Sequence, residues 1–163
     1  MTHPQVADLE ALLEALCEAE IEFIVVGGAA AVIHGAPITT MDLDVIYRLT
    51  DANIDRFLSL LEGLEARVRD PAGRDLVPNR SHLEAKGPLL LSTNLGPLDP
   101  MASLADGRGY EELFEHSIQA EGGDLPIRIL DLETLIEVKT AAGRAKDRLM
   151  LPVLLALLEV RRQ

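Results

Sequence analysis

Two aspartates at the start of an apolar run constrain the fold of this chain most. Residues 39–48 read TTMDLDVIYR, in which Asp42 and Asp44 are separated by one leucine and followed by Val-Ile-Tyr. The apolar run predicts a buried strand over 42–48. Because side chains alternate between the faces of a strand, both carboxylates project to the same side, with their backbones about 7 Å apart. Like charges placed in this way repel each other unless a cation lies between them.

The aspartate pair admits two interpretations. Two such carboxylates can hold one divalent ion, or two ions about 3.5–4 Å apart, and Mg²⁺ or Mn²⁺ prefers carboxylate oxygens. In the alternative, one aspartate caps the turn before the strand, the other faces solvent, and no ion is involved.

A glycine pair stands upstream of the aspartates. Residues 22–28, EFIVVGG, predict a second buried strand that ends at Gly27 and Gly28, and residues 29–34 predict a short helix. Glycines at such a turn let a phosphate approach the backbone, and the helix start offers free N–H groups. The competing explanation is a tight turn that needs glycine for its conformation alone.

The rest of the pattern predicts an α+β fold with one small mixed β-sheet flanked by helices and a C-terminal helical pair. Two strand pairs are expected, with turns at 94–96 and at Gly122-Gly123, and the polar residues 69–81 predict a loop. Apolar residues at helical spacing predict the remaining helices over 6–20, 50–68, 110–117, 131–143 and 146–160.

The length predicts one domain over residues 1–163. Within it we expect an N-terminal helix (5–20), a sheet with its helices (21–130) and C-terminal helices (131–161). The only cysteine, Cys17, excludes an intrachain disulfide and a cysteine-based zinc site, and its apolar neighbours predict that it is buried. Because neither a signal-peptide core nor a membrane-spanning run is found, we expect a cytoplasmic protein without membrane contact.

The charge balance narrows the class of partner. The net charge is −12, from 27 acidic residues against 15 Lys and Arg, and aromatic residues make up only 3%. Nucleic-acid binding normally depends on basic residues that neutralise phosphates, so this balance disfavours a nucleic-acid partner without excluding one. It suits a cationic or neutral small molecule, or a basic partner protein.

The motif order of residues 22–44, strand-GG-helix-G-x-P-x-x-T-x-D-L-D, resembles the DNA polymerase β-type nucleotidyltransferase superfamily. It is most similar to the small bacterial branch that includes abortive-infection-type toxins. The resemblance implies a metal-dependent enzyme that transfers a nucleoside monophosphate from a nucleoside triphosphate (NTP) to an acceptor hydroxyl. Asp42 and Asp44 would then hold Mg²⁺ or Mn²⁺.

The resemblance also implies further site residues. Asp99, in LGPLDPM, matches the third catalytic and metal-binding carboxylate of the family, whereas without the resemblance a turn residue before Pro100 is the preferred interpretation. Lys139 would bind nucleotide or, alternatively, extend its ammonium to water. The other nucleotide-binding positions implied are Gly27, Gly28 and Thr40. In the stretch GRAKD, Arg144, Lys146 and Asp147 are expected to form an ion network between helices.

One position departs from the family pattern. Ile38 stands four residues before Asp42, where many members of this branch carry Arg. This substitution motivates a second hypothesis: a catalytically degenerate binding or regulatory module with the same fold, such as a toxin–antitoxin component. A third is an unrelated α+β domain in which the aspartate spacing is a coincidence. The acceptor (small molecule, tRNA or protein) and any partner protein or homo-oligomer are not specified.

The histidines give weaker signals than the carboxylates. His34 follows the glycine pair on the short predicted helix and is expected to be a packing residue. His82 and His116 lack the spacing of a metal-binding pair.

Overall fold

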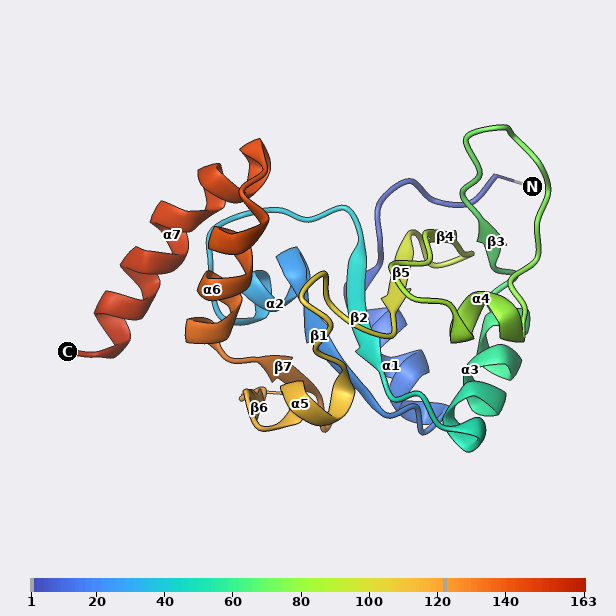
Figure 1. The fold of residues 1–163 in the computed structure, drawn as a ribbon, viewed down its shortest axis with the longest axis horizontal. Coiled ribbons are helices and arrows are strands. Elements are labelled where there is room, and N and C mark those ends of the chain that lie inside the picture. Colours follow the sequence, from blue (N-terminus) through green and yellow to red (C-terminus); the bar gives the residue numbers. More distant parts are fainter. Residues whose placement is uncertain (1, 122) are drawn as a thin grey trace.

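The two apolar runs that flank the glycine pair form the centre of a mixed sheet. The computed structural model describes residues 2–121 and 123–163. Within these residues seven strands form one sheet, in the order β3-β4-β5-β2-β1-β7-β6 (Figure 1). The strands are β1 (Phe23–Val26), β2 (Leu43–Tyr47), β3 (Arg67–Val68), β4 (Leu91–Ser92), β5 (Leu98–Met101), β6 (Ser117–Gln119) and β7 (Arg128–Leu130).

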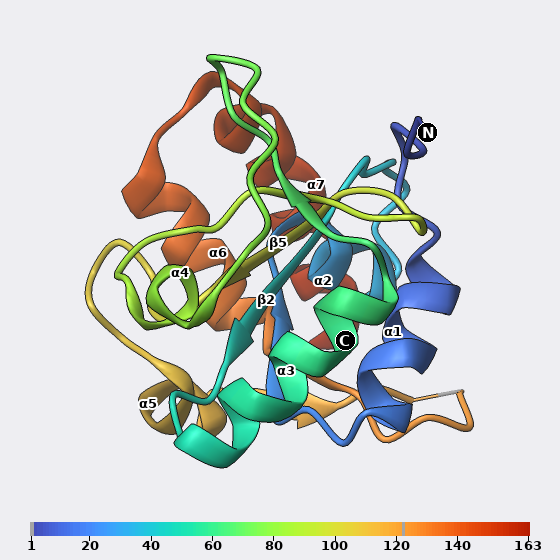
Figure 2. The ribbon, with the colours of Figure 1, turned by 90° about the vertical axis from the view of Figure 1, so that its right-hand side faces the viewer.

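Helices cover this sheet, and two of them form the C-terminal pair. Figure 1 shows α6 and α7 beside α2 at one end of the molecule, whereas α3 and α4 lie at the other end. Figure 2 views the molecule from the α3 end, with α6 and α7 behind the sheet. The helices are α1 (Leu9–Glu18), α2 (Gly27–Ile33), α3 (Asp51–Gly63), α4 (Arg80–Glu84), α5 (Tyr110–Phe114), α6 (Leu132–Ala142) and α7 (Ala145–Arg161). The predicted fold class is thus confirmed.

The register of the central strands brings distant acidic residues together. β1 is antiparallel to β2 and places Val26 opposite Asp44. β2 is parallel to β5 and places Asp44 opposite Asp99. Partners directly opposite each other on adjacent strands project to the same face of a sheet. The strand order therefore positions Asp99 beside the aspartate pair.

The core explains why β1 and β2 lie at the centre. All four residues of β1 are buried, as are four of the five in β2, with Asp44 the exception. Asn53 on α3 is completely buried and joins the two strands. Its side-chain oxygen accepts from the backbone N–H of Glu22 at 2.8 Å, and its amide donates to the carbonyl oxygens of Glu22 and Arg48 at 3.1 and 2.8 Å. This satisfied polar group fixes the angle at which α3 packs on the sheet.

The helix predicted over 50–68 extends too far at its C-terminal end. α3 ends at Gly63, and Glu65 has a left-handed backbone with φ of 55°. That conformation ends a right-handed helix and turns the chain into β3, which the pattern did not predict. The predicted loop 69–81 is likewise too long, because Asn79 caps the short helix α4 by accepting a hydrogen bond from the backbone N–H of His82.

The two strand pairs predicted around turns are both present. β4 pairs antiparallel with β5 around the turn at 94–96, where Thr93 and Gly96 exchange backbone hydrogen bonds. β6 pairs antiparallel with β7, although Gly122 of the predicted turn lies outside the described residues. The prediction that Cys17 is buried is wrong: it is only half-buried, because its position on α1 lies beside a surface pocket. No helix in the described residues combines the length and apolar character needed to span a membrane.

Candidate active site

Three carboxylates gather at one edge of the central strands. Asp42 lies in the bend before β2, Asp44 lies on β2, and Asp99 lies on the parallel neighbour β5. One oxygen from each side chain lies within 4.8 Å of the other two. The structure thus brings together the three acidic residues that the sequence singled out, although Asp99 is more than fifty positions away along the chain.

Burial makes this cluster electrostatically unfavourable without a cation. Asp99 is only 4% exposed. Desolvation, together with a hydrogen bond that protonated Asp99 donates to Asp42, raises the pKa of Asp99 to about 7. Desolvation and the charge of Asp42 raise the pKa of Asp44 to about 6. Shifts of this direction are expected when like charges share a partly dry site.

The donor set fits a hard divalent cation. Asp99 Oδ1 is buried, and Arg69 Nη2 lies 2.8 Å from it without the alignment of a hydrogen bond. A buried carboxylate is costly unless positive charge lies beside it, and a metal ion would add to the charge of Arg69. Three carboxylates with oxygens within 4.8 Å of one another offer the ligands that Mg²⁺ and Mn²⁺ prefer. Asp42, Asp44 and Asp99 are therefore the residues that would hold such an ion.

Arg69 is a site residue that the sequence did not indicate. Its Nη2 lies 2.8 Å from Asp99 Oδ1, and its Nη1 donates to the carbonyl oxygen of Leu91 at 2.5 Å. Its positive charge opposes the upward shift in the pKa of Asp99. Arg69 directly follows β3 in the segment predicted as a polar loop, and only the pairing of β3 with β4 places it near β5. No local motif marks such a residue.

The glycine pair has a clear steric role. Gly27 has φ of +64°, and a Cβ there would collide with the carboxylate of Asp44. A Cβ at Gly28 would lie 2.9 Å from the hydroxyl oxygen of Thr40. Both glycines thus make room for side chains at the carboxylate cluster. Thr40 in turn donates to the backbone oxygen of Asp42 at 3.1 Å, which fixes the bend before β2.

Lys139 is buried in an ion pair rather than extended to water. It is 6% exposed, and its Nζ lies 3.0 Å from Asp147 Oδ1. Arg144 Nε lies 2.7 Å from the other oxygen of Asp147. The expected network between the C-terminal helices is present, but Lys139 takes the place that the sequence assigned to Lys146. The alternative in which Lys139 extends to solvent is therefore wrong, and its role in nucleotide binding stays a prediction.

His34 is a packing residue, as expected. It is 5% exposed, and its Nε2 donates to the carbonyl oxygen of Leu130 at 2.7 Å. Because Nε2 carries the proton, Nδ1 accepts from Arg161 Nη1 at 2.8 Å. The histidine thereby attaches the end of α7 to α2, away from any catalytic chemistry.

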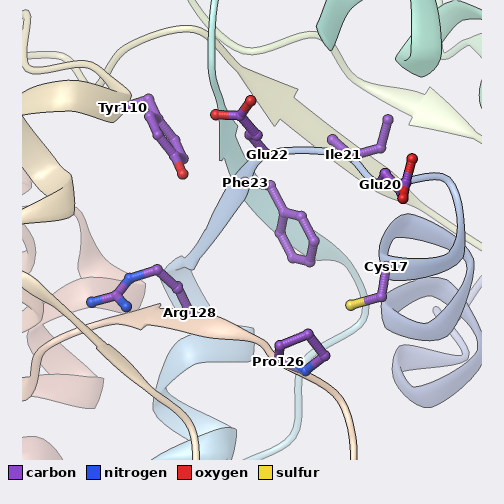
Figure 3. A pocket seen from close by; sticks show the side chains of 8 residues that line it. All are labelled: Cys17, Glu20, Ile21, Glu22, Phe23, Tyr110, Pro126 and Arg128. Carbon is purple, nitrogen blue, oxygen red and sulfur yellow. The ribbon is translucent and has the colours of Figure 1, made fainter.

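A pocket of about 280 Å³ lies at the other end of β1 from the carboxylates. Figure 3 shows Phe23 at its centre, with Cys17 on one side and Tyr110 and Arg128 on the other. Arg128 already donates to Ser117 and stacks over the ring of Phe114. With the Arg128 guanidinium engaged in these contacts, we assign the pocket no role.

Comparison with known proteins places this geometry in a wider context. No known family model and no curated protein sequence matches the chain. Solved structures do. The antibiotic-resistance factor ANT(2″)-Ia, in complex with adenylyl-2″-tobramycin, superposes with a TM-score of 0.59 at 16% identity, over 94% of this chain and 89% of that chain.

Two further structures extend the likeness. The lincosamide antibiotic adenylyltransferase LnuA, bound to lincomycin, gives a TM-score of 0.59 at 13% identity, over 94% of this chain and 99% of that one. A candidate nucleotidyltransferase from Thermotoga maritima gives 0.56 at 16% identity, over 96% and 99%. At such identities the likeness concerns the fold. The chain has the polymerase β-like nucleotidyltransferase fold, with an acidic triad consistent with a catalytic site of that kind.

Proposed function

We propose that this protein is a metal-dependent nucleotidyltransferase that transfers a nucleoside monophosphate from an NTP to an acceptor hydroxyl. The observation that carries the proposal is the convergence of Asp42, Asp44 and Asp99. The likeness in fold to two antibiotic-modifying or adenylyl-transferring proteins supports it. The paired raised pKa values of Asp44 and Asp99 match a site built for a cation.

The carboxylates would have distinct tasks. All three would hold Mg²⁺ or Mn²⁺, which when bound neutralises the phosphate charge that develops during transfer. Asp99 would also orient the acceptor hydroxyl and accept its proton, the task of a general base. The acceptor oxygen forms a bond to the α-phosphorus, the bond from that phosphorus to the bridging oxygen breaks, and pyrophosphate leaves.

The backbone around the triad would complete the donor site. Gly27, Gly28 and Thr40 border Asp44 and Asp42, so an NTP held at the triad would pass against them. Such an arrangement makes catalysis largely a matter of positioning and charge stabilisation.

The acceptor proposed is a small molecule. The net charge of −12 disfavours a polyanion such as tRNA. ANT(2″)-Ia and LnuA were solved with small molecules bound, namely adenylyl-2″-tobramycin and lincomycin. A tRNA or protein acceptor, as the toxin-type resemblance implies, is the alternative.

Release of pyrophosphate tests the proposal. Purified wild-type protein is incubated with Mn²⁺ or Mg²⁺, each of the four NTPs and a library of hydroxyl-bearing acceptors. We expect metal-dependent pyrophosphate release that Asp44→Asn lowers by about a thousandfold or more, because charge stabilisation at such a site contributes several kcal/mol. Equal release by the two proteins would contradict the assignment. Glu159→Gln, a neutral change at an exposed site on α7, is the matched control.

The contact of Arg69 with Asp99 favours a second candidate function. A guanidinium 2.8 Å from the third carboxylate competes with a metal ion there. In this alternative the protein binds nucleotide without turnover and acts as a regulatory module. It would release no pyrophosphate with any acceptor, and Mg²⁺ or Mn²⁺ would not raise its melting temperature.

A further inference from the structure

One cationic side chain pairs with the carboxylate triad. Arg69 directly follows β3, and its Nη2 lies 2.8 Å from Asp99 Oδ1. Among the ion pairs of the described residues, no other one includes a carboxylate of the triad. Figure 1 shows β3 and β4 on the side of β5 that faces away from α6 and α7. The guanidinium therefore reaches Asp99 from the side of the sheet opposite to the C-terminal helices.

The backbone of the sheet holds Arg69 beside the triad. Its backbone N–H donates to the carbonyl oxygen of Leu90 at 2.8 Å, and its Nη1 donates to the carbonyl oxygen of Leu91 at 2.5 Å. Leu91 in turn pairs with Leu98 on β5, the residue before Asp99. Because these carbonyl groups belong to the sheet itself, the guanidinium stays beside Asp99 whether or not the carboxylate also binds a metal ion.

Burial makes Asp99 dependent on positive charge. The residue is 4% exposed, whereas the side chain of Arg69 is 33% exposed and therefore partly hydrated. A buried charge that loses its partner destabilises a protein strongly. A guanidinium and a metal ion can each supply the positive charge that this carboxylate requires.

The neighbouring arginines do not share this arrangement. Arg67 pairs with Asp75 at 3.1 Å, and Arg74 pairs with Asp70 at 2.7 Å. Both acids lie in the segment that follows β3, so these two arginines are neutralised locally. Arg69 instead pairs with an acid on another strand, thirty positions away along the chain.

Resting on the proposed function, we propose that Arg69 is a permanent counter-ion of Asp99 that takes the place of a second metal ion, so that the triad by itself holds one divalent cation rather than two. The ionised triad carries three negative charges. Arg69 supplies one positive charge, and a single divalent ion supplies the other two. A second divalent ion would then meet a site without net negative charge and a fixed guanidinium that repels it.

Replacement of one cation by the other tests this inference without any need for turnover. Melting temperatures are measured at pH 8, in EDTA and in saturating Mn²⁺, for wild type, R69Q, R69K and the control R74Q. We expect R69Q to melt about 5 °C or more below wild type in EDTA, because a buried carboxylate loses its partner. Mn²⁺ should remove at least half of this deficit, since the ion supplies the missing charge.

The two other variants separate charge from local structure. R69K keeps the positive charge and should respond to Mn²⁺ as wild type does. R74Q removes the same charge from the same segment, and any deficit it has should be equal in EDTA and in Mn²⁺. An equal deficit in the two conditions for R69Q would show that Arg69 acts only on local structure, and would overturn the inference.

Titration calorimetry with Mn²⁺ alone counts the ions and measures their affinity. Wild type should bind one Mn²⁺ per chain, and R69Q should bind its first ion about tenfold more tightly, because the guanidinium no longer repels it. Two ions of similar affinity in wild type, or equal affinity in wild type and R69Q, would overturn the role of Arg69 and leave the proposed function standing. If Mn²⁺ neither binds to wild type nor stabilises it, the proposed function fails as well. The number of ions in wild type decides the question even if R69Q does not fold.

Discussion

At the scale of single residues, the carboxylates of the triad oppose one another in the metal-free protein. Burial and mutual repulsion raise the pKa of Asp44 to about 6 and that of Asp99 to about 7. Residues placed for function at the expense of stability are common in active sites. The triad is therefore expected to destabilise the fold when no cation is bound.

We predict that Asp44→Asn stabilises the metal-free protein at pH 8 while removing its response to metal. The variant loses a partly buried charge, so the free energy of unfolding should rise by about 1–3 kcal/mol. Urea unfolding in EDTA measures this, and a Mn²⁺ titration of the melting temperature measures the response. A variant less stable than wild type, with an unchanged response to Mn²⁺, would contradict the role given to Asp44.

The same two residues set a pH dependence. Their folded pKa values lie above the ordinary 3.8, so the folded state binds more protons than the unfolded state between about pH 4 and 7. Their contribution to stability is complete below pH 4 and is lost as the pH rises through 6 and 7. We predict that wild type, relative to a D44N/D99N double variant, loses stability in EDTA across this range. If the free energies of unfolding of the two proteins changed with pH in parallel, the pKa values of Asp44 and Asp99 would not be raised.

At the scale of elements, the C-terminal pair depends on one buried acid. Burial opposes ionisation of Asp147, but hydrogen bonds from Arg144 and Lys139 outweigh it and lower its pKa to about 2. Because this folded pKa is depressed, its stabilisation is present above pH 4 and is lost as the pH falls toward 2. The ion pair thus joins α6 to α7 under all ordinary conditions.

We predict that Asp147→Ala destabilises the protein by about 3–5 kcal/mol, because it leaves the buried Lys139 without its partner. Urea unfolding at pH 7 measures the loss, with Glu159→Ala as the exposed control on the same helix. A double variant, Asp147→Ala with Lys139→Met, should recover part of that loss. Should D147A unfold like the control, the ion pair would not hold the two helices together.

Much of the element order could be predicted because its signals are local. The apolar runs of β1 and β2, the helical spacing of α1 and α6 and the turn at 94–96 are each written in short stretches. Element boundaries that depend on backbone conformation could not be predicted. The end of α3 is an example, because nothing in the sequence indicates the left-handed φ of Glu65. β3 and α4 are too short for periodicity to register.

The candidate site shows the same division between local and distant signals. Asp42 and Asp44 could be identified from their spacing. Asp99 could be identified only through the family resemblance. Arg69 and the pairing of Lys139 with Asp147 depend on which strands and helices become neighbours. Such contacts follow from topology, and a single sequence does not specify them in advance.

At the scale of the whole molecule, the candidate catalytic residues lie together at one end of the central strands. The triad lies where β2 and β5 run parallel. In the pocket at the other end of β1, Arg128 donates hydrogen bonds to Ser117. Both the solved relatives and this chain share the fold at 13–17% identity, so the site residues must carry the argument for activity.

The central claim is that Asp42, Asp44 and Asp99 hold a divalent cation together with a nucleoside triphosphate. A crystal structure with Mn²⁺ and a non-hydrolysable NTP analogue tests it most directly, because anomalous scattering locates manganese without ambiguity. We predict at least one manganese peak about 2.1 Å from carboxylate oxygens of the triad, with the phosphates of the analogue bound to the same ion. Full occupancy of the analogue elsewhere, with no manganese between the three aspartates, would contradict the account.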